Sequence, residues 1–123
     1  MPHHGACEAY TTHLPTLRIF LAKCDERGRD VSTIAERFAR LIAYHMAHTF
    51  GGCQTRTVDS LWLNPDTGQL VAAQTIVVEC LAERTAVTTA ANKLAKLIGD
   101  YADKAYQRSI LVEYDGRQVW GTY

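Results

Sequence analysis

The chain has 123 residues, which fits one domain, and 47% of them are hydrophobic, as in globular proteins. Its 13 lysine and arginine residues balance 13 aspartate and glutamate residues, and this zero net charge argues against nucleic-acid binding, which needs a basic excess. No apolar run approaches the ~20 residues of a membrane span and the N-terminus lacks the apolar core of a secretory signal, so we expect a cytoplasmic protein with no membrane partner.

The first segments of the chain predict an arm and a strand. Residues 1–14 are polar and show no hydrophobic periodicity, so we expect a flexible N-terminal arm there and a single α+β domain over residues 15–123. Apolar residues alternate with others over residues 16–24, and this period of two is typical of a β-strand. A charged loop follows the strand.

A helix is expected after this loop. Thr33 and Glu36 have the spacing of a capping box, and Gly51 and Gly52 supply the stop. At about 100° per residue, one face of the helix is apolar. That face comprises Ile34, Phe38, Leu41, Ile42 and Met46.

The middle of the chain predicts a long β-hairpin. Residues 53–64 and 70–83 are predicted to form two strands, and the turn between them contains Pro65 and Gly68, which favour turn geometry. The run at residues 76–78 is apolar on both faces, which fits a central strand.

The last third predicts a helix and two strands. Residues 85–108 carry an apolar stripe at helical spacing, residues 109–114 favour a strand, and Asp115-Gly116 favours a tight turn before a closing strand at 117–123. The complete order predicts an α+β, ferredoxin-like βαββαβ fold. Two helices would cover one face of its antiparallel sheet, and an extra strand would follow at the C-terminus.

Two helices on one side leave the other face of the sheet uncovered. Alternation along the strands places a mixed set of residues on that face, namely Arg18, Phe20, Thr75, Val77, Glu79, Leu111 and Glu113. The facing of Trp62 stays open, since Leu61 and Leu63 share the other phase of its strand. A face this apolar usually contacts another surface, so we predict a homodimer packed sheet to sheet. A ligand cleft on this face is the alternative.

Several segments support this fold by resemblance. They are TLRIFLAK at residues 16–23, DVS before the first helix, the pattern from Phe50 to Trp62, AQTIVVECLAE, and YADKAYQRSILVEYD. Together they resemble a family of small bacterial proteins catalogued as a domain of unknown function, over residues 16–115. The resemblance implies a ferredoxin-like α+β domain and implies no activity.

Two histidines near the end of the first helix form the first candidate site. His45 and His48 are three residues apart and Cys53 follows, but zinc needs three or four converging ligands, so we predict no metal. We expect partly buried, hydrogen-bonded histidines, or histidines that line a ligand pocket. On the predicted apolar face His45 must find a polar partner. If that partner were Glu79 or Glu113, the pair could act as an acid/base couple.

Arg18 with Glu79 and Glu113 forms the second candidate site. In a ferredoxin-like sheet the first strand lies between the third and the fourth, so Arg18 can pair with either glutamate on the uncovered face. A structural or interface ion pair is the simplest interpretation. An anion-binding or acid/base pocket is the alternative.

These patterns favour a small binding or interaction protein without a cofactor. We predict a homodimer that takes a small, partly apolar ligand or a protein partner in a pocket between sheet and helices. The predicted ligand-binding residues are Arg18, Phe20, His45, His48 and Trp62. The alternative is a cofactor-free enzyme of the dimeric α+β-barrel kind, with His45 and a carboxylate as acid and base and Arg18 holding an anionic substrate.

Overall fold

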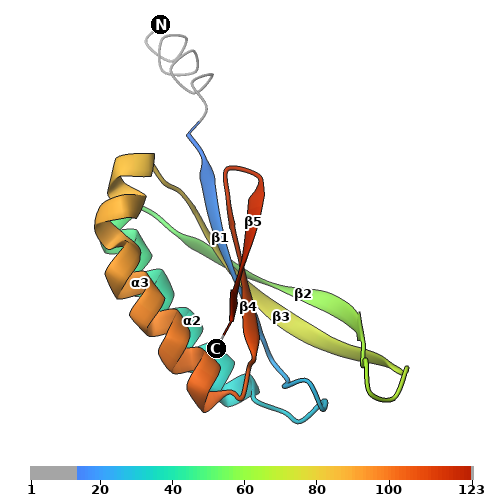
Figure 1. Cartoon of the computed structure of the whole chain (residues 1–123). Helices are drawn as coiled ribbons and strands as arrows, with labels where there is room; N and C mark the ends of the chain where they lie inside the picture. Colours follow the sequence, from blue (N-terminus) through green and yellow to red (C-terminus); the bar gives the residue numbers. More distant parts are fainter. Residues whose placement is uncertain (1–13, 123) are drawn as a thin grey trace, which may run out of the picture.

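A computed structural model describes residues 14–122, so the predicted arm lies outside the described residues except for Leu14. The predicted α+β class is confirmed, and every predicted helix and strand is present (Figure 1). The elements are β1 (Thr16–Ala22), α2 (Ser32–Phe50), β2 (Gln54–Leu63), β3 (Leu70–Leu81), α3 (Arg84–Lys104), β4 (Ser109–Tyr114) and β5 (Arg117–Thr122).

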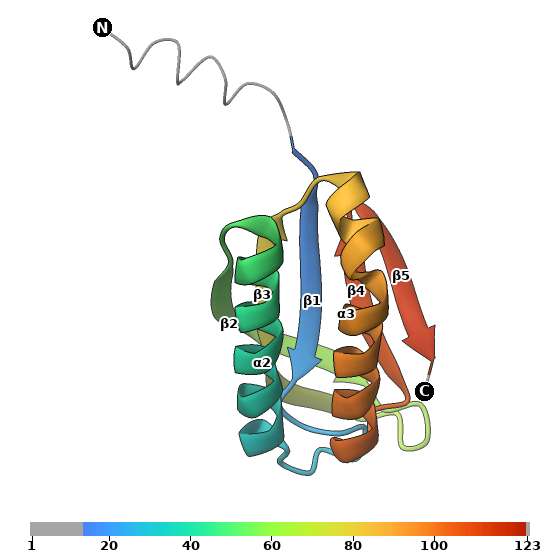
Figure 2. The ribbon, with the colours of Figure 1, turned by 90° about the vertical axis from the view of Figure 1, so that its left-hand side faces the viewer.

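The strands form one antiparallel sheet in the order β2-β3-β1-β4-β5. The fifth strand, at the β4 edge, makes this order differ from the four-stranded ferredoxin-like pattern. Both helices lie side by side across the same face of the sheet (Figure 2). The opposite face, which we call the open face, is covered by neither α2 nor α3 (Figure 2). Neither helix in the described part of the chain has the length and hydropathy needed to cross a membrane.

The core lies between the helices and the sheet, and period-two alternation supplies its sheet side. Leu17, Ile19 and Leu21 of β1 point into it, as do Ile76 and Val78 of β3. All five side chains are buried. The core also receives Tyr101 of α3, which donates its hydroxyl proton to the Ala22 carbonyl at the end of β1. The opposite phase of each strand is thereby left for the open face.

The orientation of α2 differs from the prediction. Its buried residues are Ala35, Phe38, Ala39, Ile42 and Met46, whereas Leu41 is 44% exposed. The buried face is therefore turned by about 50° from the predicted one, at about 100° per residue. Two alanines cause this difference, because their small side chains let the helix backbone lie close to the sheet. His45 consequently lies at the edge of the buried face and not at its centre.

The start of α2 also differs slightly from the prediction. The helix begins at Ser32, one residue before the predicted capping box at Thr33. The Asp30 carboxylate accepts hydrogen bonds from the Ser32 backbone N–H at 2.8 Å and from its hydroxyl. This short acidic side chain therefore binds the first turn in place of the predicted box.

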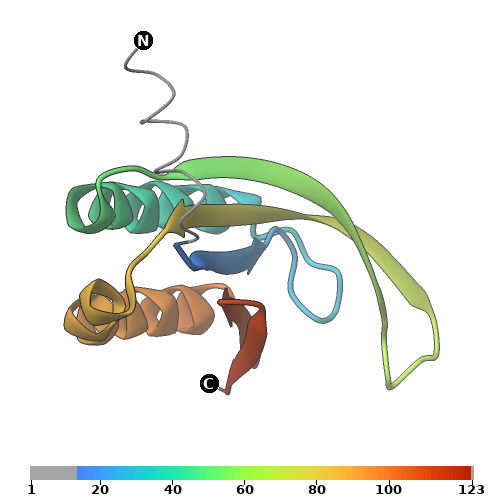
Figure 3. The same ribbon diagram turned by 90° about the horizontal axis from the view of Figure 1, so that it is seen from above.

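The strands of the β2–β3 hairpin, with 10 and 12 residues, are longer than the other three strands of the sheet. The outer part of the hairpin, residues 58–75, extends away from the helices (Figures 1 and 3), and we call it the hairpin arm. The predicted turn is present: Gly68 has a φ of 70°, and its N–H donates to the Asn64 carbonyl. The arm therefore carries strand residues that no helix covers.

Candidate functional site

A row of polar side chains crosses the open face from β2 to β4. The strand register places Gln54 opposite Glu79, Glu79 opposite Arg18, and Arg18 opposite Glu113. Directly opposed residues in antiparallel strands project from the same face. We call these four residues the polar row. The sequence-predicted group of Arg18, Glu79 and Glu113 is thus brought together on three strands.

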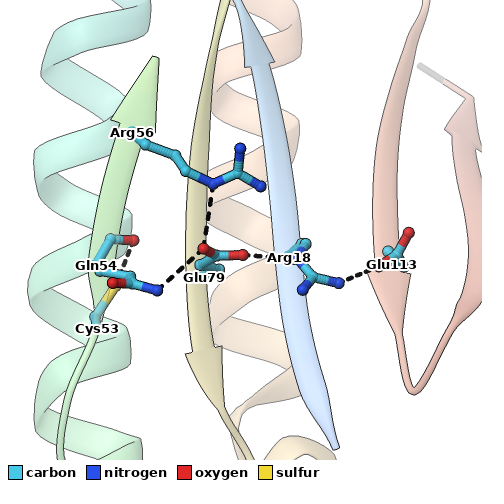
Figure 4. A network of polar contacts seen from close by, with 6 residues as sticks. All are labelled: Arg18, Cys53, Gln54, Arg56, Glu79 and Glu113. Carbon is cyan, nitrogen blue, oxygen red and sulfur yellow. Dashed lines mark hydrogen bonds and ion pairs between the residues drawn. The ribbon is translucent and has the colours of Figure 1, made fainter. Parts of the chain in front are cut away.

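Hydrogen bonds connect the whole polar row (Figure 4). The Arg18 guanidinium donates from Nε to Glu79 Oε2 at 2.6 Å and from Nη1 to Glu113 Oε1 at 2.5 Å. The other oxygen of Glu79, Oε1, accepts from Gln54 Nε2 at 3.1 Å. Because Arg18 lies on the central strand, it links the two carboxylates that flank it.

Arg56 of β2 also joins the polar row, because it lies two residues beyond Gln54 on the same face of the strand. Its Nε donates to Glu79 Oε1 at 3.2 Å, and its side chain is 51% exposed. Figure 4 shows the guanidinium reaching from β2 across β3. Two guanidinium groups and two carboxylates therefore meet on this face, and their formal charges sum to zero.

Glu79 is the buried centre of this network. Its side chain is 9% exposed. Burial alone would raise the pKa of Glu79, but the hydrogen bonds from Arg18 and Arg56 outweigh it and hold the pKa below the usual range. The hydrogen bonds to Glu79 and Glu113 raise the pKa of Arg18. Glu79 is therefore an ionised, fully engaged acceptor at neutral pH, which suits electrostatic positioning better than proton transfer.

A cavity of about 550 Å³ adjoins the polar row at the start of β1. Arg18, Gln54 and Glu79 line it together with Phe50 and Cys53. Burial raises the pKa of the Cys53 thiol, so this cysteine is not a thiolate nucleophile at neutral pH. The cavity offers charged hydrogen-bonding groups on one side and apolar surface on the other.

A second cavity, of about 500 Å³, lies further along the same strands, and we call it the aromatic pocket. Its lining is mostly apolar and includes Phe20, Val58, Trp62 and Leu111. Phe20 and Val58 are each two residues beyond the charged Arg18 and Arg56, so on these two strands the pocket begins where the charged residues end. Asp25 and Glu26 of the loop after β1 also line it. Aromatic and aliphatic surface of this volume suits a small organic ligand.

Polar groups at the aromatic pocket already have partners within the chain. The hydroxyl groups of Ser60 and Thr75 form a hydrogen bond at 2.7 Å. The Asp25 carboxylate accepts from Arg29 Nε at 2.7 Å and from two backbone N–H groups of its own loop. Although burial opposes it, these bonds lower the pKa of Asp25. Asp25 therefore fixes the loop after β1 and shapes the pocket wall.

The two predicted histidines lie elsewhere. His45 is on α2, on the helix side of the sheet, whereas Glu79 and Glu113 bond on the open face. The predicted acid/base pair of His45 with either glutamate is therefore not formed, because the sheet separates them. His45 Nε2 is buried and has no hydrogen-bond partner among the described residues. His48 is exposed, with its ring 4.4 Å from that of Tyr44.

The predicted ligand-binding residues thus divide between two sides of the molecule. Phe20 and Trp62 share the aromatic pocket, and Arg18 lies beside it, whereas the helix residues His45 and His48 do not contribute to it. Within residues 14–122 no group of three or more histidine, cysteine or acidic side chains is arranged to hold a metal ion.

Sequence analysis missed two members of the site, Gln54 and Arg56. Both alternate in phase with Trp62 along β2, and the register of β2 against β3 places all three on the open face. The polar residues on both sides of β2 concealed this phase. Counting the pairing back from the predicted turn to Glu79 would have identified both residues.

Comparison with known proteins gives a fold likeness only. No protein-family model matches the chain, and no curated protein matches it. The fold is similar to that of a phage SAM lyase in complex with S-methyl-5'-thioadenosine, with a TM-score of 0.63 and 15% identity over 89% of this chain and 90% of that one. It is also similar to a phage SAM lyase in its apo state, with a TM-score of 0.58 and 17% identity over 89% of each chain.

Proposed function

We propose that this chain binds S-adenosylmethionine (SAM), or a related sulfonium nucleoside, on the open face and cleaves it as a lyase. The observation that carries the proposal is the juxtaposition of the aromatic pocket with the polar row on one sheet face. The fold likeness to a phage SAM lyase, which extends over nearly the whole chain, supports the choice of ligand. The proposal gives the predicted cofactor-free enzyme a different set of residues.

The aromatic pocket suits the nucleoside part of such a ligand. Phe20 and Trp62 offer ring faces on which a purine can stack, and such stacking is worth about 1–3 kcal/mol per base. Ring faces also attract a ligand cation such as a sulfonium. A cavity of about 500 Å³ is within the size range of small-molecule sites.

The chemistry of this cleavage fits a site without a free general acid. When the C–S bond breaks, its electron pair passes to the sulfur, which leaves as a neutral thioether and needs no proton. In the same step the α-carboxylate of the substrate forms a C–O bond to the carbon that loses sulfur and closes a lactone, so no water and no added proton are consumed. Positive charge disappears from the sulfur in this step, and an apolar pocket favours such a loss of charge over the charged reactant.

A homodimer remains part of the proposal, with a changed contact surface. Val77 and Thr75 of the open face are already buried within one chain, whereas Leu61, Leu63 and Leu70 on the hairpin arm are exposed. We propose that a second copy covers the arm. We also assign β1 to β4 and the two helices to the ferredoxin-like arrangement, which the position of β1 between β3 and β4 supports.

The test is direct. Purified chain is incubated with SAM, and S-methyl-5'-thioadenosine is measured by liquid chromatography. Wild type should release it steadily, and Trp62→Ala should lose about tenfold in rate or affinity, as expected for a lost stacking face. Tyr44→Ala, on the exposed side of α2, is the matched control and should behave as wild type.

Two other results would decide between the proposed lyase, a binding protein without activity, and a different ligand class. Binding of S-methyl-5'-thioadenosine in calorimetry without any release from SAM would favour the predicted non-enzymatic binding protein. Absence of both binding and release would refute the proposed ligand class, whatever the oligomeric state.

A further inference from the structure

We propose that the polar row, with Arg56 at one end and Glu113 at the other, is a subsite for a zwitterionic α-amino acid group. Arg56 would bind the α-carboxylate and Glu113 the α-ammonium group. The inference rests on the proposed function because it places the rest of the ligand, the nucleoside, in the aromatic pocket. What it adds is the chemical group of the ligand that the polar row binds.

Arg56 has the geometry of a carboxylate receptor. Its Nε is held by Glu79, and its two terminal nitrogens donate to no other side chain or carbonyl within residues 14–122. These two nitrogens form the planar fork that binds a carboxylate through two parallel hydrogen bonds. The buried, ionised Glu79 thus fixes the arginine in place and leaves its fork available.

Glu113 offers the complementary group. Its Oε1 accepts from Arg18, while Oε2 accepts no hydrogen bond from the described part of the chain. The Glu113 side chain is 18% exposed, so that oxygen can be reached by an ammonium group. Arg18 and Glu79 lie between Arg56 and Glu113 and neutralise each other, so the two ends of the row differ in sign.

The charge balance selects a zwitterion over a simple ion. The network of Arg18, Arg56, Glu79 and Glu113 is neutral as it stands. A phosphate would meet two carboxylates along with the guanidinium groups, and a simple amine would meet two guanidinium groups. A group that carries both charges can match both ends of the row and leave its net charge unchanged.

The position of the subsite fits the proposed reaction. The aromatic pocket adjoins the polar row along β1 and β2, so a ligand can lie along the strands with its base in the pocket. SAM differs from S-methyl-5'-thioadenosine by the amino-acid fragment, which is the part that a lyase removes. The polar row would therefore hold the departing fragment, and the nucleoside product would lose its contacts there.

Calorimetry with two nucleosides tests the subsite. S-Adenosylhomocysteine carries the amino-acid end and S-methyl-5'-thioadenosine lacks it. Arg56→Gln and Glu113→Gln should each weaken S-adenosylhomocysteine by about tenfold, the usual value of a lost charged hydrogen bond. Neither should change the affinity for S-methyl-5'-thioadenosine. Arg37→Gln, an exposed arginine on α2, is the matched control.

If the two variants lose the same affinity for both nucleosides, or lose affinity for neither, the subsite is overturned. If neither nucleoside binds wild type, the proposed function fails, and NMR titration with L-methionine then decides the subsite alone. Shifts with L-methionine that are absent with N-acetylmethionine methyl ester and absent in Arg56→Gln would sustain it. No shift with L-methionine would overturn the subsite as well.

Discussion

Glu79 on β3 and Arg18 on β1 are opposed in the sheet register and joined by a 2.6 Å hydrogen bond between Arg18 Nε and Glu79 Oε2. The pair does more than connect two strands. Through Glu79 it also positions Arg56, and through Arg18 it positions Glu113. Because the Glu79 side chain is nearly inaccessible to water, its charge is stabilised mainly by the guanidinium groups of Arg18 and Arg56.

Glu79→Gln should therefore lower the free energy of unfolding by about 2 kcal/mol, because it removes the negative charge of a partly buried ion pair and replaces one acceptor oxygen with an amide donor that faces a guanidinium group. Urea unfolding followed by circular dichroism measures this change. Glu36→Gln is the matched control: Glu36 is half-exposed and pairs with Lys23 at 3.5 Å. That surface pair should contribute at most about 0.5 kcal/mol. Equal effects of the two substitutions would contradict the central position of Glu79.

The same carboxylate should make stability depend on acid pH. The folded-state pKa of Glu79 lies below its ordinary value of 4.5, so the unfolded chain takes up this proton first as the pH falls. The stabilisation is fully present above that ordinary value and is lost as the pH falls through the lowered pKa. The pKa of Asp25 is also lowered, so Asp25 contributes to the loss of stability in acid in the same direction.

Measurement of unfolding free energy from pH 7 down to pH 2 checks this expectation. Wild type should lose stability more steeply than Glu79→Gln below about pH 4.5, and the two curves should converge in strong acid. Parallel curves across the whole range would show that Glu79 has the same pKa folded and unfolded.

Much of the polar row was predictable from strand alternation. Period two places Arg18, Glu79 and Glu113 in the phase opposite to the core residues of β1, β3 and β4, and the buried residues of each core phase are apolar. β2 lacks this contrast, since Arg56 faces one side and Thr57 the other, and both are exposed. Without its register, the phase of β2 cannot be read from residue types.

The helix face was less predictable for a different reason. Large apolar residues such as Leu41 dominate a hydrophobic pattern, but close packing on a sheet favours small residues such as Ala35 and Ala39. The resulting rotation moved His45 away from the centre of the core. A pattern of residue types alone does not contain this steric preference.

His45→Leu should leave the protein as stable as wild type or stabilise it by up to about 1 kcal/mol, because it replaces a buried, unpartnered nitrogen with apolar surface. Thermal unfolding monitored by circular dichroism measures this. The proposed release of S-methyl-5'-thioadenosine from SAM should be unchanged, since the sheet separates His45 from the open face. A fall in turnover with unchanged stability would instead restore His45 as an acid/base candidate.

The hairpin arm gives the last prediction. Leu63 and Leu70 are directly opposed on β2 and β3, and Leu61 lies two residues away on the same face. All three are exposed, Leu70 to 69%. An isolated two-stranded arm is marginally stable in water, so three neighbouring leucines there favour contact with a second copy.

Leu70→Lys should weaken the dimer at least about tenfold, since a charge would be desolvated at the contact. Light scattering after size-exclusion chromatography over a concentration series measures the dissociation. Leu81→Lys, at the other end of β3, is the matched control because Leu81 is also more than half exposed, and it should leave the dimer intact. A wild-type chain that stays monomeric at every concentration would contradict the predicted homodimer. The proposed ligand site would not be lost in a monomer, because residues of one chain line both cavities.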